Sequence, residues 1–148
     1  KTHCKTILDE LSGLGCKIIG DKIIKKFVSD KIQIATKKDW ITEYLSPTIS
    51  VKVVNGVIEA IDHINKYGTS HTDTIVTQNK KTAKVFLSSV KSSIAIQNAS
   101  TQFADGGEFG FGAEVGISTN KLHPRGPIGL DQLTTYKYIL EGNGQIRK

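Results

Sequence analysis

Residues 48–97 read TISVKVVNGVIEAIDHINKYGTSHTDTIVTQNKKTAKVFLSSVKSSIAIQ, and this stretch decides the fold. Apolar and polar side chains alternate from Thr48 to Val54, which predicts a half-buried strand. Asn55 is the expected cap of a following helix, Gly68 its expected stop, and Thr74–Thr77 a second strand. The apolar residues that recur at helical spacing between them are Val57, Ile58, Ile61 and Ile64.

A second helix and a third strand complete the stretch. Asn79 is the expected helix cap, and Ser93–Gln97 is the expected strand. The apolar face of the helix comprises Ala83, Phe86, Leu87 and Val90. Helical crossovers of this length join parallel strands, so we expect strands 49–54, 74–77 and 94–97 in one sheet with helices packed on it. The predicted fold class is α/β with a three-layer arrangement.

The flanking segments carry weaker patterns. Residues 5–14 predict a helix closed by Gly15, and Cys16–Ile19 predicts a short strand, whereas 21–36 is mixed and unassigned. Residues 136–140 and 145–147 are predicted to pair as a terminal hairpin around Gly142, Asn143 and Gly144.

Composition limits the classes of function. The 148 residues suffice for one domain, and the net charge of +6 comes from lysines that are scattered without interleaved aromatic residues, so we expect no nucleic-acid partner. No apolar run is long enough for a membrane span, which predicts a cytoplasmic protein without membrane partners. Cys4 and Cys16 fit neither a disulfide framework nor a zinc site, and we expect reduced thiols and no metal. The sequence has no methionine, which suggests that residue 1 is not the natural start.

Polar side chains follow the third predicted strand. Ligands of open α/β sheets gather at the carboxyl ends of strands, which is where Asn98, Ser100 and Thr101 stand. These residues are candidates for substrate binding, and the alternative is that they only satisfy the backbone of a turn.

Three further features allow competing interpretations. The glycines between 106 and 112 match neither a dinucleotide fingerprint nor a P-loop, and indicate tight turns near a ligand. Arg125 lies between Pro124 and Pro127, where its guanidinium is able to grip a carboxylate or phosphate; a plain surface arginine is the alternative. His71 and Asp73 form a polar pair that more often fixes a loop than performs acid/base chemistry.

Two segments carry a family resemblance. The run NASTQFADGGEFGFGAEVGIST from Asn98, continued by KLHPRGPIGL at 121–130, resembles the carboxyl-terminal signature of gamma-glutamyl phosphate reductases and of the reductase half of bifunctional pyrroline-carboxylate synthases. YGTSHTD at 67–73 is similar to both. EYLSP at 43–47 resembles the Glu-x-Phe-Gly-Pro motif of aldehyde dehydrogenases, from which Leu45 and Ser46 depart.

The resemblance implies an enzyme of proline biosynthesis that reduces L-glutamyl 5-phosphate to glutamate 5-semialdehyde with NADPH. It implies a cofactor contact for Glu43, whose alternative is an exposed helical glutamate, and substrate contacts for Asn98, Ser100, Thr101 and Arg125. It also implies that residues 1–134 are the carboxyl-terminal part of an aldehyde-dehydrogenase-like catalytic domain, and that 135–148 form an oligomerisation hairpin of a homo-oligomer.

The resemblance does not extend to the family's catalytic nucleophile. That cysteine lies in a Cys-Asn-x-x-Glu-Thr run, which neither Cys4 nor Cys16 matches, so no catalytic residue is assigned in this chain. The nucleotide-binding domain is also missing, and we expect no tight NADPH binding. Three hypotheses stay open: part of a reductase that is inactive as the isolated chain, whether truncated, cleaved or naturally split; a degenerate domain with a non-catalytic binding role; and an unrelated basic binding module.

Overall fold

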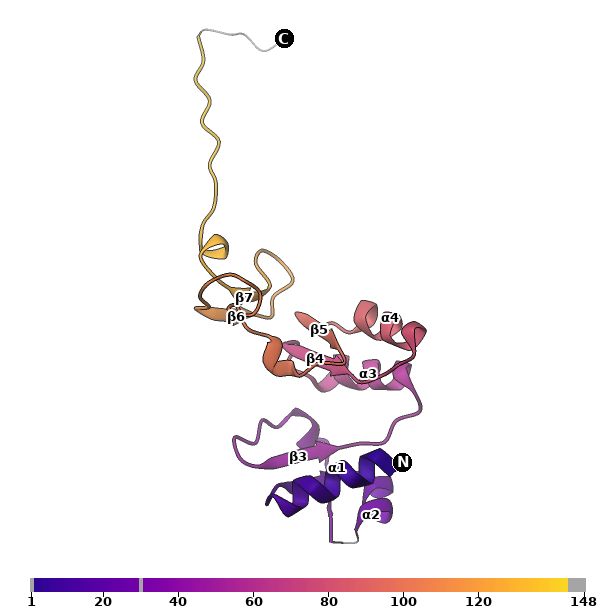
Figure 1. The fold of residues 1–148 in the computed structure, drawn as a ribbon. Coiled ribbons are helices and arrows are strands. Elements are labelled where there is room, and N and C mark those ends of the chain that lie inside the picture. Colours follow the sequence, from indigo (N-terminus) through magenta and orange to yellow (C-terminus); the bar gives the residue numbers. More distant parts are fainter. Residues whose placement is uncertain (1, 30, 144–148) are drawn as a thin grey trace.

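The computed structural model describes residues 2–29 and 31–143, and its helices and strands form two α/β units followed by a small antiparallel pair of strands (Figure 1). The α-helices are α1 (Thr2–Gly13), α2 (Lys22–Val28), α3 (Val57–Tyr67) and α4 (Lys80–Ser89). The strands are β1 (Lys17–Gly20), β2 (Gln33–Ile34), β3 (Thr48–Val51), β4 (Thr72–Ile75), β5 (Ile94–Gln97), β6 (Gly116–Ser118) and β7 (Gly126–Ile128). Short 3-10 helices are η1 (Asp39–Ile41), η2 (Thr101–Phe103) and η3 (Asp131–Leu133). The α/β class and the parallel pairing of strands are confirmed.

The first unit is a parallel sheet of order β2-β1-β3 with α1 and α2 packed on it. Its core consists of Leu8, Ile18, Ile24 and Ile32. Asp21 begins α2, because its Oδ1 accepts a hydrogen bond from the backbone N–H of Ile24 at 2.8 Å. The segment 21–36, which carried no clear periodicity, thus supplies α2 and the edge strand β2.

The second unit pairs β4 with β5 in parallel, and α3 and α4 pack against each other beside them. Its core consists of Ile61, Phe86 and Val90. Asn79 begins α4 as predicted, with Oδ1 accepting from the Thr82 N–H at 3.0 Å. The cap of α3 is Gly56 at φ +86° rather than Asn55, and Gly68 ends this helix as predicted.

The prediction of one three-stranded sheet is wrong. β3 pairs with β1 in the first unit, whereas β4 and β5 form a separate sheet. β3 is held in the first unit because Val51 packs on its core and Asp21 Oδ2 accepts from the Val53 N–H at 2.8 Å. The strand predicted at 74–77 lies at Thr72–Ile75, so Thr77 belongs to the loop after it.

The carboxyl-terminal part begins with the antiparallel pair β6–β7, which the sequence did not predict. Before it, Gly110 and Gly112 adopt φ of +79° and +77°, which confirms that glycines are used here for tight turns. Beyond η3 the chain runs outward as an extended segment (Figure 1), and no strand is assigned in 135–143. Residues 145–147 of the predicted terminal hairpin lie outside the described residues, so the hairpin stays a prediction. No helix in the described part of the chain is long and apolar enough to cross a membrane.

Candidate functional site

The carboxyl ends of β4 and β5 open into a cavity of about 870 Å³, which we call the edge cavity. Its lining residues come from β4, from the loops that follow β4 and β5, and from the first residue of η2: Thr74, Val76, Thr77, Gln78, Asn98, Ala99, Ser100 and Thr101. The substrate-binding candidates Asn98, Ser100 and Thr101 therefore lie together at the sheet edge where ligands of parallel sheets bind.

Hydrogen bonds distinguish these three candidates. Asn98 adopts φ +56° and joins the two loops: its Oδ1 accepts from the Thr77 N–H at 2.8 Å, and its Nδ2 donates to the Thr77 carbonyl at 2.9 Å. Ser100 Oγ accepts from the Gln102 N–H at 3.2 Å and begins η2. The Thr101 hydroxyl makes no hydrogen bond within the described residues, so it is the candidate most available to a ligand.

Glu43 extends from a loop that side-chain hydrogen bonds hold in place. The Tyr44 hydroxyl donates to Asp39 Oδ1 at 3.0 Å and lies 2.9 Å from Ser50 Oγ. Hydrogen bonds from the Thr36 hydroxyl and N–H, and then from Tyr44, lower the pKa of Asp39 below its ordinary value. The loop is thereby tied to β3, and the exposed Glu43 is carried toward the second unit.

Glu43 lines a second cavity of about 480 Å³, which we call the polar cavity. Its lining residues are Glu43, Thr69, His71, Thr72, Thr101 and Thr119. Thr101 lines both cavities, so the polar and edge cavities adjoin at this residue. The structure therefore brings the cofactor candidate Glu43 to the substrate candidate Thr101, although 58 positions separate them in sequence (101 minus 43).

His71 also lines this cavity, although the sequence favoured a loop-fixing role over acid/base chemistry for it. Its Nδ1 lies 2.6 Å from Thr72 Oγ1. Burial raises the pKa of the neighbouring Asp73 carboxyl, and a hydrogen bond from the Ser92 hydroxyl and attraction to His71 oppose that rise. The signal in the sequence was the position of His71 directly before β4, within the segment 67–73 that carried part of the resemblance.

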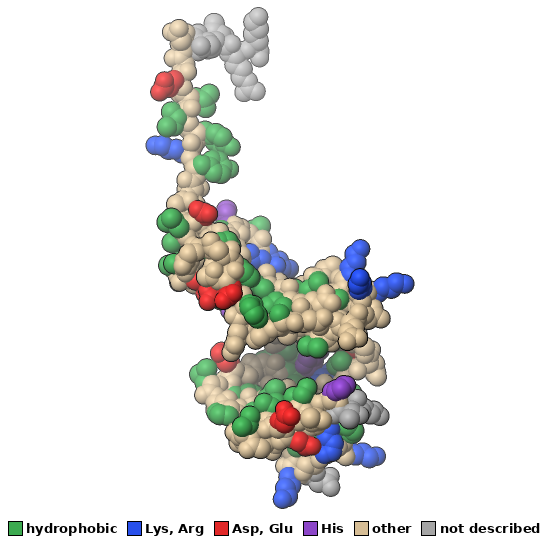
Figure 2. All heavy atoms as spheres, viewed as in Figure 1, with side chains coloured by type: hydrophobic (Ala, Val, Ile, Leu, Met, Phe, Trp, Pro, Cys, Tyr) green, Lys and Arg blue, Asp and Glu red, His purple; other side chains and the backbone are tan. Residues whose placement is uncertain are grey.

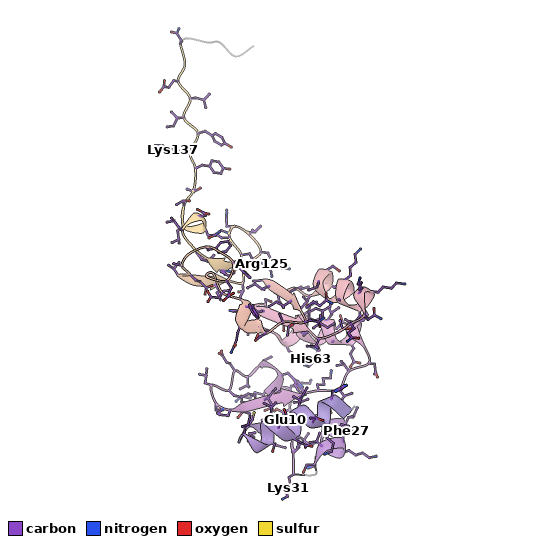
Figure 3. All side chains as sticks on the ribbon, viewed as in Figure 1. Glu10, Phe27, Lys31, His63, Arg125 and Lys137 are labelled. Carbon is purple, nitrogen blue, oxygen red and sulfur yellow. The ribbon has the colours of Figure 1, made fainter. Side chains whose placement is uncertain are left out.

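Arg125 is not brought to the other candidates. It lies in the connection between β6 and β7 (Figure 3). Its Nη2 donates to the carbonyl of Lys91, which precedes the amino end of β5. Asn98 follows the opposite end of that strand, and Arg125 lines neither the edge cavity nor the polar cavity. Its hydrogen bond instead fixes the β6–β7 connection to the second unit.

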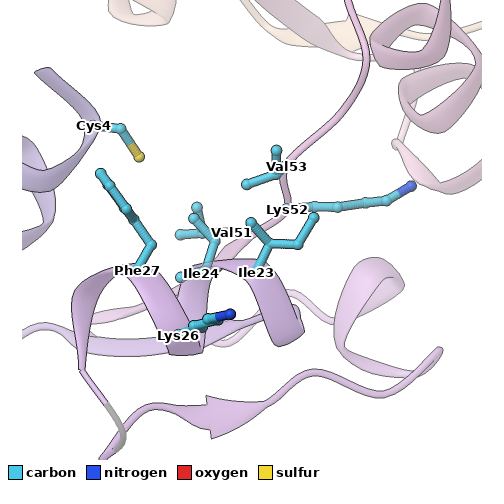
Figure 4. Close-up of a pocket in the computed structure, with 8 residues that line it drawn as sticks. All are labelled: Cys4, Ile23, Ile24, Lys26, Phe27, Val51, Lys52 and Val53. Atoms are coloured by element: carbon cyan, nitrogen blue, oxygen red, sulfur yellow. The ribbon is translucent and has the colours of Figure 1, made fainter. Parts of the chain in front are cut away.

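The two cysteines lie in the first unit. Cys4 borders an apolar cavity of about 610 Å³ between α1, α2 and β3, together with Ile23, Phe27 and Val53 (Figure 4). Cys16 is half-buried after α1, with Sγ 3.8 Å from the Lys17 carbonyl oxygen. Neither thiol lines the polar or the edge cavity. Residues 2–29 and 31–143 contain no cluster of histidine, cysteine, aspartate and glutamate suited to a metal ion.

Comparisons with known proteins match the whole chain. It is 55% identical over 148 residues to the gamma-glutamyl phosphate reductase of Thermoanaerobacter sp. (strain X514) and 53% identical over 146 residues to that of Parvibaculum lavamentivorans. These matches cover 100% and 99% of the chain but only 36% and 34% of the relatives. No family model matches.

The solved structures that resemble this chain carry the same name as the sequence relatives. The gamma-glutamyl phosphate reductase of Thermotoga maritima superposes with a TM-score of 0.88 at 45% identity, over 97% of this chain and 34% of that one. The Saccharomyces cerevisiae enzyme of the same name gives a TM-score of 0.53 at 36% identity, over 72% of this chain and 28% of its own. The chain therefore belongs to the gamma-glutamyl phosphate reductase family and spans about a third of the length of the relatives that it matches.

Proposed function

We propose that this chain is part of an NADPH-dependent reductase that converts L-glutamyl 5-phosphate to L-glutamate 5-semialdehyde in proline biosynthesis. The relatives are named for the reduction of gamma-glutamyl phosphate, and their identity to this chain reaches 55%. Because the chain spans about a third of their length, the complete activity requires residues beyond these 148.

The observation that carries the proposal is the junction of the two cavities at Thr101. Hydride transfer requires cofactor and substrate to be in contact, and a single site lined by Glu43 on one side and by the edge loops on the other allows that. The hydroxyl groups, the imidazole and the carboxylate that line this site are suited to orienting polar ligands.

The residues of the polar cavity fit a part of the cofactor. The Glu43 carboxylate is exposed and makes no ion pair among the described residues, so its oxygens are available to the hydroxyls of a ribose. When bound, NADPH supplies the hydride. The part played by this chain is to accept hydrogen bonds from the cofactor through Glu43 and to orient substrate through the Thr101 hydroxyl. Asn98 and Ser100 hold the loops at the edge cavity, where they also border the substrate.

The reduction of an acyl phosphate through a thioester requires a thiolate at the substrate. Cys4 borders the apolar cavity, and Cys16 lies after α1, so neither is beside Thr101 in this structure. We therefore expect the isolated chain to be inactive, and a separate segment to supply the nucleophile and the nucleotide-binding part.

A paired assay tests this proposal. NADPH oxidation with L-glutamyl 5-phosphate would be followed with this chain alone, with the remaining two thirds of the Thermoanaerobacter relative alone, and with both together. We expect turnover only in the mixture. Replacing Glu43 with Gln should then raise the KM for NADPH more than the KM for substrate, because an amide is a weaker acceptor for ribose hydroxyls.

Two outcomes would contradict the proposal. Turnover by the lone chain that is abolished by Cys4→Ala or Cys16→Ala would place the nucleophile in this chain. A mixture that forms a stable complex but never oxidises NADPH would favour a degenerate domain with a binding role only.

A further inference from the structure

The polar cavity has an uneven distribution of charge. Four of its six lining side chains are neutral threonines, Glu43 is anionic, and His71 is the one lining residue able to carry a positive charge. An anionic oxygen of a ligand, placed in this cavity away from Glu43, can therefore be attracted by one side chain, that of His71. The neutral groups that line the cavity are the hydroxyls of the four threonines, Thr69, Thr72, Thr101 and Thr119.

The imidazole of His71 is held in place from one side. Its Nδ1 lies 2.6 Å from Thr72 Oγ1, at the amino end of β4. Within the described residues, Nε2 has no hydrogen-bond partner. The ring is half-buried, and the carboxylate of Asp73 attracts it, while Ser92 holds that carboxylate by a hydrogen bond. A half-buried ring fixed at one nitrogen and open at the other is arranged to donate to a ligand.

We propose that His71 is a substrate-binding residue whose Nε2–H donates to an anionic oxygen of the substrate in the polar cavity. The inference rests on the proposed function for the identity of the substrate, an acyl phosphate of an amino acid. Such a molecule has two groups with anionic oxygens that can accept this hydrogen bond: its phosphoryl group and its α-carboxylate.

Binding can be tested without any catalytic activity. The imidazole resonances of the four histidines in this chain would be followed by NMR while inorganic phosphate or L-glutamate is added at constant ionic strength. We expect a saturable shift of His71 with one of the probes, and none for His3, His63 or His123. Equal shifts of all four histidines, or no shift of His71 with either probe, would overturn the proposal even if the reductase activity is established.

Kinetics of the complemented enzyme distinguish the two sources. In the reverse direction phosphate and glutamate 5-semialdehyde are separate substrates, so each has its own KM. His71→Ala should raise the KM for phosphate, or that for the semialdehyde, about tenfold with a smaller change in kcat, which corresponds to the loss of one charge-assisted hydrogen bond.

His71→Gln, which keeps a side-chain N–H, should recover part of the affinity, and His3→Ala on the exposed face of α1 is the matched control. Unchanged KM values in His71→Ala would contradict the proposal. If the mixture forms a stable complex but is inactive, the proposed function fails, and the NMR result alone decides whether His71 binds the anion.

Discussion

Asn98 shows how a single side chain joins two loops that are distant in sequence. Its amide makes one hydrogen bond to the Thr77 N–H and one to the Thr77 carbonyl, and its backbone is in the left-handed region. Asn98→Ala should lower the free energy of unfolding by about 2–3 kcal/mol, since it loses both hydrogen bonds and alanine tolerates the left-handed backbone region less well than asparagine does.

Asn98→Gly separates the two contributions. Glycine tolerates positive φ, so this variant should lose only about 1–2 kcal/mol from the two hydrogen bonds. Denaturant unfolding of both variants measures the difference. If alanine and glycine are equally stable at this position, backbone strain makes no contribution, and the account of Asn98 is wrong.

Asp73 makes the stability of the second unit depend on pH. Burial raises the pKa of its carboxyl above the ordinary 3.8, against the hydrogen bond from Ser92. The folded state therefore favours the protonated carboxyl. The stability due to this group is fully present below pH 3.8 and is lost as the pH rises through the folded pKa. Asp73→Asn should be more stable than the parent protein at neutral pH, and the difference should disappear at low pH.

Urea unfolding across this pH range measures the effect. Ser92→Ala is the informative companion variant, because it removes the hydrogen bond that opposes the rise in pKa. As the pH rises, Ser92→Ala should lose more stability than the parent protein does. A pH profile of Asp73→Asn parallel to that of the parent would contradict this interpretation.

At the scale of elements, His63 of α3 connects the two units. Its ring lies edge-on to Trp40 of η1 with ring centroids 5.3 Å apart, and its centroid lies 4.8 Å from that of Tyr67. Lys52, the residue after β3, has its Nζ 3.5 Å from His63 Nδ1 and 3.6 Å from the Glu59 carboxylate. α3 of the second unit thus contacts two parts of the first: η1, which precedes the Glu43 loop, and the connection that follows β3.

This junction should weaken in acid. Burial lowers the pKa of His63 below the ordinary 6.5, the charges of Lys52 and Lys66 lower it further, and Glu59 opposes them. The stability from the neutral ring is present above pH 6.5 and is lost as the pH falls through the folded pKa. His63→Phe keeps an aromatic ring against Trp40 and should flatten this acid-side slope in thermal unfolding. His3→Ala should leave the slope as it is, and a slope unchanged in His63→Phe would refute the assignment.

On the scale of the whole molecule, the carboxyl-terminal segment carries exposed apolar side chains away from both cores (Figure 2). Tyr138 is 84% exposed and Leu140 is 92% exposed, on an extended backbone without a strand partner within 135–143. An extended segment of this kind gains backbone hydrogen bonds and apolar contacts by adding to a sheet edge of another chain. We therefore predict self-association through residues 135–148.

Sedimentation velocity tests this prediction. The 148-residue chain should form a dimer or larger oligomer as concentration increases, whereas a chain that ends at Thr134 should sediment as a monomer at every concentration. Tyr138→Asp should weaken association without a change in the helical signal of the two units. A full chain that stays monomeric at high concentration would count against the prediction.

The order of elements from Thr48 to Gln97 and the α/β class follow from sequence alone. Periodicity records which side of an element is buried, and caps such as Asn79 mark helix starts through bonds to residues three positions away. The family resemblance was also readable from sequence, because it rests on runs of consecutive residues, at 67–73, 98–119 and 121–130.

Tertiary structure decided which strands pair and which polar residues meet. The alternation of apolar and polar residues in β3 indicates which of its side chains are buried, but not which strand it pairs with. Its pairing with β1 depends on contacts with a core whose residues lie between positions 8 and 32. Likewise, Glu43, His71 and Thr101 share a cavity because two separately packed units and the loop after β5 converge there, whereas Arg125 is drawn to the Lys91 carbonyl. Local patterns determine conformation over a few residues, and these contacts join residues 28 to 58 positions apart, which only the packed chain brings together.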